Sequence, residues 1–114
     1  MSDNKKEELE ERKKEITKKR DKIQNEYNAI CKRNEEIDSY IEKRTWDIRR
    51  EMDNPMIASD PELLEMYQEK AARLKEFSDK ESEFRYEIDK QYKKLNSKLD
   101  EEEQALEQEY EEEP

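Results

Sequence analysis

The stretch MDNPMIASDPE, residues 52–62, divides the chain into two long arms and decides the fold. Asn54-Pro55 ends the first arm, because the residue before a proline is steered away from helical backbone angles. Pro61 suits the first turn of a second helix, where its missing N–H is not needed. Since a connection this short joins neighbouring helices in opposite directions, the stretch predicts a bend between two antiparallel helices.

The second helix has two candidate N-caps just before Pro61. Ser59 has capping-box spacing to Glu62, whereas Asp60 directly precedes the proline, and either side chain can accept from the free N–H groups of the first turn. The expected domain is a single helical hairpin, residues 1–114. Its expected parts are a first helix at about 4–53, a loop at about 54–60, a second helix at about 61–110 and an acidic C-terminal tail.

Apolar residues of the two arms mirror each other about the bend. The members of several pairs are equally distant from the point between Ile57 and Ala58: Leu9 with Leu106, Ile16 with Leu99, Ile23 with Tyr92, Tyr27 with Ile88, Ile41 with Leu74. Two further pairs deviate by one residue: Ile30 with Phe84 and Ile37 with Phe77. Facing arms must change from apolar to polar at the same height, so the symmetry predicts an all-α fold, an antiparallel two-helix coiled-coil hairpin.

The arms contain nothing that breaks a helix, since the chain has no glycine and its three prolines are Pro55, Pro61 and Pro114. Apolar residues recur every seven positions in the first arm: Leu9, Ile16, Ile23, Ile30, Ile37. A row with this period keeps facing its partner only if the two helices wind around each other with a left-handed twist.

Polar residues follow the same symmetry. Asn34 faces Glu81, and we expect a hydrogen bond between their side chains that fixes the register of the two helices. The basic segment 12–22 faces the acidic segment 100–113, which predicts an intramolecular charge match. Because the acidic arm would repel phosphate, we expect no nucleic-acid binding.

Composition argues against several classes of function. Only 30% of the residues are hydrophobic and 51% are charged, and histidine and glycine are absent. We therefore expect no enzyme, no metal site and no cofactor, because general bases, nucleophile pairs and phosphate-binding loops depend on those residues. Cys31 is the single cysteine and cannot form an internal disulfide. Without a signal-peptide pattern or an apolar span, a cytoplasmic location and no membrane span are expected, with export alongside a partner as an alternative.

A group of apolar residues near the bend falls outside the expected helix contact. Its members are Trp46, Tyr40, Met66, Met56 and Ile57. Exposed aromatic residues close to other apolar groups are typical of a protein-binding surface, so we interpret them as a docking site. The partner is another helical protein or a second copy of the chain. The alternative is that Trp46 folds over the bend and covers its end.

A helical hairpin of this length with a tryptophan near its bend resembles the WXG100 group of type VII secretion proteins. It also resembles the small helical adaptors that accompany LXG toxins. Where the WXG100 family has W-x-G, this chain has Trp46-Asp47-Ile48, and no tyrosine is followed four residues later by Asp or Glu as in the family's export signature. The chain is therefore more similar to an accessory adaptor, and the resemblance implies binding to the helical leader domain of a secreted toxin.

Two other classes of function fit the same pattern. Small helical hairpins of similar length and charge occur as coiled-coil stalks or chaperones of flagellar and type III export systems. A purely structural coiled coil without a specific client is the third possibility.

Overall fold

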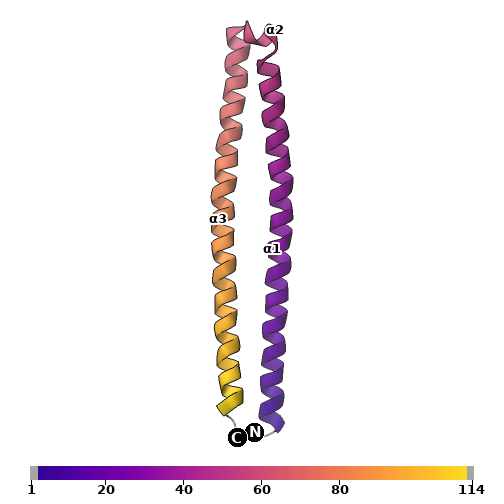
Figure 1. The fold of residues 1–114 in the computed structure, drawn as a ribbon, viewed down its shortest axis with the longest axis vertical. Coiled ribbons are helices and arrows are strands. Elements are labelled where there is room, and N and C mark those ends of the chain that lie inside the picture. The colour runs from indigo at the N-terminus through magenta and orange to yellow at the C-terminus, as the bar shows by residue number, and fades with distance from the viewer. Residues whose placement is uncertain (1–2, 113–114) are drawn as a thin grey trace. The chain divides into compact units, whose positions relative to one another are not determined.

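The computed structural model describes residues 3–112 and consists of three helices. They are α1 at Asp3–Met52, α2 at Pro55–Ala58 and α3 at Pro61–Glu112 (Figure 1). The described residues contain no strand, so the prediction of an all-α fold is confirmed. Of the expected acidic tail, Glu111 and Glu112 belong to α3, and residues 113–114 lie outside the described residues.

The bend contains a short helix that the sequence pattern did not predict. Asn54 adopts an extended backbone and its side-chain oxygen accepts from the main-chain N–H of Met56 at 3.0 Å, which caps α2. Asp60 then caps α3, because its carboxylate accepts from the N–H groups of Glu62 and Leu63 at 3.1 and 3.3 Å. Of the two candidate caps, Asp60 is therefore the one used for α3.

Ser59 has a different role from the one that capping-box spacing suggests. Its hydroxyl donates to the main-chain oxygen of Pro55 at 2.6 Å, and its N–H donates to the same oxygen at 3.1 Å. Ser59 thus closes the C-terminal end of α2 and leaves the start of α3 to Asp60.

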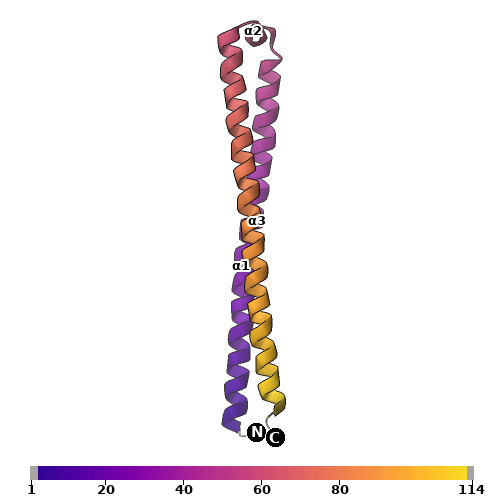
Figure 2. The same cartoon turned by 90° about the vertical axis from the view of Figure 1, so that its left-hand side faces the viewer.

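The chain divides into two compact units, which we describe separately. The terminal unit contains the described residues up to Ile30 and those from Ile88 onward. The bend unit contains Cys31–Glu87. In the terminal unit the α1 and α3 segments lie side by side in both views of the ribbon (Figures 1 and 2).

The terminal unit has a closed apolar core. Its buried members are Leu9, Ile16, Leu99 and Leu106, with Ile23 packed against them. Leu9 is only 1% exposed. Burial of one such side chain contributes about 1.5–3 kcal/mol, so these residues hold the two segments together.

Polar contacts surround that core. Arg12 pairs with Glu109 at 2.9 Å, and Arg20 pairs with both Asp100 and Glu103 at 2.5 and 2.7 Å. These pairs confirm the charge match predicted between segments 12–22 and 100–113.

A stacked pair of tyrosines completes the contact in the terminal unit. The rings of Tyr27 and Tyr92 have centroids 4.0 Å apart and an interplanar angle of 15°. The Tyr27 hydroxyl donates to Asp89 at 2.6 Å, and the Tyr92 hydroxyl donates to Gln24. The expected partner of Tyr27 was Ile88. Its ring stacks instead on Tyr92, which lies about one helical turn further along α3.

The bend unit has only one fully buried hydrophobic residue among its described positions, Ile48, which is 6% exposed. Its α1 and α3 segments also make polar contact near the bend, where a hydrogen bond with Glu51 raises the pKa of Tyr67. Apolar burial thus contributes less to this unit than to the terminal unit.

Phe77 and Phe84 do not lie at the helix contact, so the pairing predicted for them with Ile37 and Ile30 is wrong. Phe77 is 42% exposed and Phe84 is 53% exposed. Ser78 and Arg85, one residue further along α3, are partly buried instead. One residue turns the side chain by about 100° around a helix, which moves both phenylalanines onto the flank of α3.

Arg85 is partly buried and contacts α1 in this part of the bend unit. Its guanidinium donates to both carboxylate oxygens of Asp38 at 2.9 and 2.7 Å and to the main-chain oxygen of Asn34 at 3.0 Å. The pKa of Arg85 is raised, first by the hydrogen bond with Asp38 and also by the charge of Glu81. A phenylalanine could satisfy none of these acceptors, which explains why arginine occupies the core position.

The expected bond between the side chains of Asn34 and Glu81 is not formed in the described part of the chain. Both residues are partly buried, and Arg85 interacts with each of them. The role of Asn34 and Glu81 in fixing the register therefore stays a prediction, while Arg85 donates to the main-chain oxygen of Asn34.

Candidate protein-interaction surface

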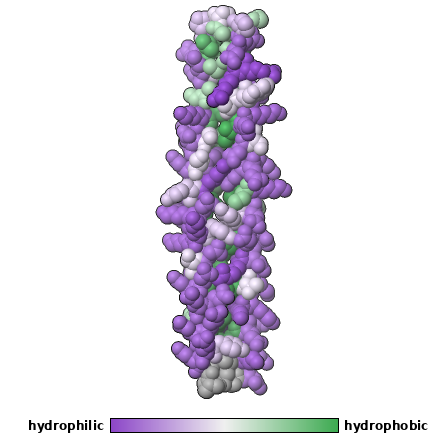
Figure 3. Space-filling model, in the orientation of Figure 1, coloured by the Kyte–Doolittle hydropathy of each residue, from purple (hydrophilic) through white to green (hydrophobic). Residues whose placement is uncertain are grey.

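Most large hydrophobic side chains that remain exposed belong to the bend unit. They are Tyr40, Trp46, Met56, Leu63, Met66, Phe77, Phe84 and Tyr86. The terminal unit contributes Leu95 and Tyr110. Figure 3 shows hydrophobic surface around α2 and in the furrow next to it, between otherwise hydrophilic side chains. Exposed apolar residues gathered in one unit are typical of a surface that a partner covers.

Trp46 projects from α1 into solvent and is 59% exposed. The guanidinium carbon of Arg50, one turn further along α1, lies 5.1 Å from the centre of its ring. This cation–π contact steadies the indole without burying it. The alternative, in which Trp46 covers the end of the bend, stays a prediction.

The other predicted docking residues lie on all three helices. Met56 is the most exposed at 80%, whereas Ile57, its neighbour in α2, is partly buried. Tyr40 is 56% exposed and Met66 is 45% exposed. Tyr40 and Trp46 are six residues apart on α1, which separates their directions by about 120° around the helix. Tyr40 and Trp46 therefore point to different sides of α1.

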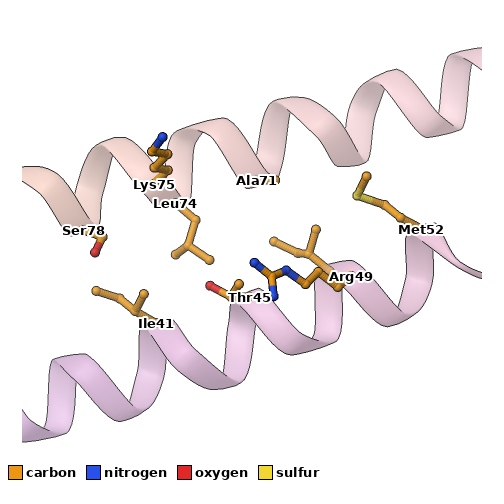
Figure 4. A pocket seen from close by; sticks show the side chains of 9 residues that line it. Ile41, Thr45, Arg49, Met52, Ala71, Leu74, Lys75 and Ser78 are labelled. Carbon is orange, nitrogen blue, oxygen red and sulfur yellow. The ribbon is translucent and has the colours of Figure 1, made fainter.

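A groove between α1 and α3 of the bend unit was not predicted from the sequence. It encloses a volume of about 420 Å³ (Figure 4). Its lining residues are Ile41, Thr45, Ile48, Arg49 and Met52 from α1 and Ala71, Leu74, Lys75 and Ser78 from α3. Figure 4 shows Ile41, Met52 and Leu74 projecting into the space between the two helices, whereas Lys75 points away from α1. The groove therefore has an apolar floor.

Small side chains create the space for this groove. Thr45, Ala71 and Ser78 are partly buried at the helix contact, where leucine or isoleucine would fill the volume. The sequence contains this signal, because Ala71, Ser78 and Arg85 follow one another at intervals of seven residues. At Ser78 the signal is weak, because its neighbour Phe77 is far more hydrophobic.

The edges of the groove carry positive charge. Arg49 and Lys75 are both exposed, and neither makes a salt bridge with another residue in 3–112. The ion pairs of the bend unit join Arg85 with Asp38 and Lys80 with Glu76. Two basic groups beside an apolar floor therefore keep their hydrogen-bond donors for solvent or a ligand.

Trp46 flanks the groove on its α1 side. It follows Thr45 directly and precedes Arg49 by three residues, so its direction differs from that of Arg49 by about 60° around the helix. Two of the predicted docking residues directly adjoin groove-lining residues of α1: Trp46 follows Thr45, and Tyr40 precedes Ile41.

The described residues show no group of three or more His, Cys, Asp or Glu side chains arranged to hold a metal ion. Within the same residues, no helix combines the length and the apolar character needed to cross a membrane. Cys31 is a partly buried free thiol. The groove and the exposed apolar side chains of the bend unit are thus the main candidates for a functional surface.

Comparison with other proteins gives no relative from which a function could be transferred. No protein-family model matches the chain, and no curated protein or solved structure is significantly similar to it.

Proposed function

We propose that the chain is an antiparallel two-helix coiled-coil hairpin that acts as a protein-binding adaptor or chaperone. The order of contacts within each unit supports this arrangement. In the terminal unit Arg12 pairs with Glu109 while Arg20 pairs with Asp100, so partners run in opposite directions along the chain. In the bend unit Asn34 accepts from Arg85, and Glu51 raises the pKa of Tyr67, in the same opposite order.

The apolar surface of the bend unit is the observation that carries the proposed binding role. Eight large hydrophobic side chains are exposed there, and a groove with an apolar floor runs between α1 and α3. Leaving so much apolar area in water is unfavourable by about 25 cal/mol for each Å², so a partner that covers it gains affinity. A helix is the natural partner, because helices pack ridges into the furrows of other helices.

The proposed client is the helical leader domain of a secreted toxin, or a sister adaptor, in a type VII secretion system. This part of the proposal rests on the resemblance to WXG100-like and LXG-associated helical adaptors. The adaptor would bind its client in the cytoplasm and guide it to the secretion machine, with export of both proteins together as an alternative.

Co-expression with leader domains of LXG toxins, followed by size-exclusion chromatography, tests the proposed function. We expect a stable complex with the wild-type chain and a weaker one with Trp46→Ala. Tyr110→Ala is the matched control, because it removes an exposed aromatic side chain from the terminal unit, where Tyr110 is 40% exposed. If no leader domain elutes with the chain, the proposed client is wrong. If Trp46→Ala leaves every complex intact, Trp46 is not part of the docking surface.

A further inference from the structure

We infer that the groove of the bend unit binds one amphipathic helix of a partner protein, and that this helix carries Asp or Glu beside its apolar face. The inference rests on the proposed protein-binding function and adds the chemistry of the partner.

The floor of the groove sets the length and the apolar pattern of the ligand. From Ile41 to Met52 it follows α1 for about three helical turns. A segment of the same length with apolar residues at every third or fourth position presents one continuous face to this floor. Because Ala71 and Ser78 are small, the backbone of α3 leaves room for side chains of the ligand to enter.

The ligand should be helical rather than extended. An extended peptide needs partners for its backbone N–H and C=O groups, and the groove lies between helices whose own backbone groups are already paired. A helix satisfies its backbone internally, so only its side chains need to fit the apolar floor.

The edges of the groove determine the charge of the ligand. Arg49 lies on α1 and Lys75 lies on α3, so each wall of the groove carries one basic residue, and the Lys75 side chain, which points away from α1, has to turn toward a bound helix to pair with it. Both groups lack salt bridges with the described residues, although the whole chain has a net charge of −10. Carboxylates on the two flanks of the ligand would pair with them, and Arg49 can bind a carboxylate with two parallel hydrogen bonds.

The same charges argue against a second copy of the chain as the occupant. A two-fold symmetric interface brings the same surface of both copies together, so the Arg49 and Lys75 side chains of one copy would approach those of the other. Like charges in a partly desolvated interface are unfavourable. A partner with acidic flanks is thus the better fit.

Two synthetic helical peptides, each about four heptads long, test the inference. They share one apolar face and differ only in their flanking residues, which are glutamates in one peptide and lysines in the other. Binding to the full chain is measured by fluorescence anisotropy of a labelled peptide. We expect the glutamate peptide to bind about tenfold more tightly than the lysine peptide, and this preference to fall with added salt.

Charge reversal in the groove should invert the preference. The variant Arg49→Glu with Lys75→Glu should bind the lysine peptide more tightly than the glutamate peptide. The matched control is Arg44→Glu with Arg73→Glu, which changes the net charge equally at residues that do not line the groove, and it should keep the original preference. Far-UV circular dichroism checks that both variants remain helical.

Each other outcome overturns the inference. Equal binding of both peptides, or the same change of preference in the control variant, means that the groove does not select acidic helices. The proposed adaptor function is unaffected by this result, because co-elution with leader domains tests it separately. Failure of both peptides to bind has the same meaning for the groove. If sedimentation equilibrium finds a dimer that dissociates on reversal of Arg49 and Lys75, a second copy occupies the groove.

Discussion

The terminal unit and the bend unit are built from the same two long helices but cover their apolar residues to different degrees. In the terminal unit four residues form a buried cluster, and Arg12 and Arg20 tie its two segments together. In the bend unit Ile48 is the only described hydrophobic residue that is fully buried, and eight large ones are exposed. The difference shows how the same two long helices can combine a segment with a closed apolar core and a segment whose apolar side chains stay exposed.

The largest expected effect separates a core residue of the terminal unit from an exposed residue of the bend unit. Leu9→Ala should lower the free energy of unfolding by about 2–4 kcal/mol, because it leaves a cavity at a position that is 1% exposed. Phe84→Ala, at a position that is 53% exposed, should cost less than about 1 kcal/mol. Urea denaturation followed by circular dichroism measures both. Equal losses would mean that Phe84 is part of the core and that the contrast between the units is wrong.

A smaller effect is expected at Arg85, which provides the polar contact of the bend unit. Arg85→Ala should lower the free energy of unfolding by about 1–2 kcal/mol, since it removes the hydrogen bonds to Asp38 and Asn34. Arg85→Met should change stability by less than about 1 kcal/mol, because an apolar chain of similar length replaces a partly desolvated ion pair. The same denaturation experiment measures both variants. A methionine variant as unstable as the alanine variant would show that the charge itself is required.

The pH dependence of stability should differ modestly between wild type and Asp38→Asn, a variant of the bend unit. The hydrogen bond from Arg85 holds the pKa of Asp38 below its ordinary value of 3.8. A depressed carboxyl pKa means that the stabilisation is present above the ordinary pKa and is lost as the pH falls through the lower, folded-state value. The melting temperature of wild type should thus decrease more than that of Asp38→Asn when the pH falls from neutral to below 3.8. Parallel curves for the two proteins would contradict this coupling.

The smallest expected effect on stability is at Trp46. Because the ring is 59% exposed, Trp46→Ala should change the free energy of unfolding by less than about 0.5 kcal/mol, and under the proposed function it should weaken partner binding. As Trp46 is the only tryptophan, its fluorescence reports directly on the bend unit. In the free protein acrylamide should quench this emission strongly, and a bound partner should protect it. Strong destabilisation by the alanine variant would assign Trp46 to the core.

Sequence alone predicts the positions of the long helices closely, because their ends depend on local chemistry. Asn54-Pro55 and Pro61 mark the bend, and α1 ends at Met52 while α3 begins at Pro61. The buried cluster of the terminal unit was also predictable from the sequence, since Leu9 and Ile16 belong to a strict heptad row. Local signals and a regular period are sufficient for these features.

The bend unit was harder to predict because its core row contains few apolar residues. The partly buried positions of α3 there include Leu64, Ala71, Ser78 and Arg85, which repeat every seven residues but lose hydrophobic character along the way. A search for apolar residues selects Phe77 instead of Ser78. Arg85 is important because Asp38 and Asn34 supply acceptors for its guanidinium. These two residues are distant from Arg85 in sequence, so a periodic pattern within one helix does not reveal the contact.

The contact between Arg85 and Asp38 has a consequence for the alignment of the two helices. If α1 slipped by one heptad past α3, Cys31 or Thr45 would take the place of Asp38, and neither side chain offers a carboxylate. A partly desolvated guanidinium would then lose its counter-ion, whereas leucine or isoleucine tolerates such a slip easily. Arg85 therefore favours one alignment among several that hydrophobic contacts alone would allow. The same alignment places the groove-lining residues of α1 opposite those of α3.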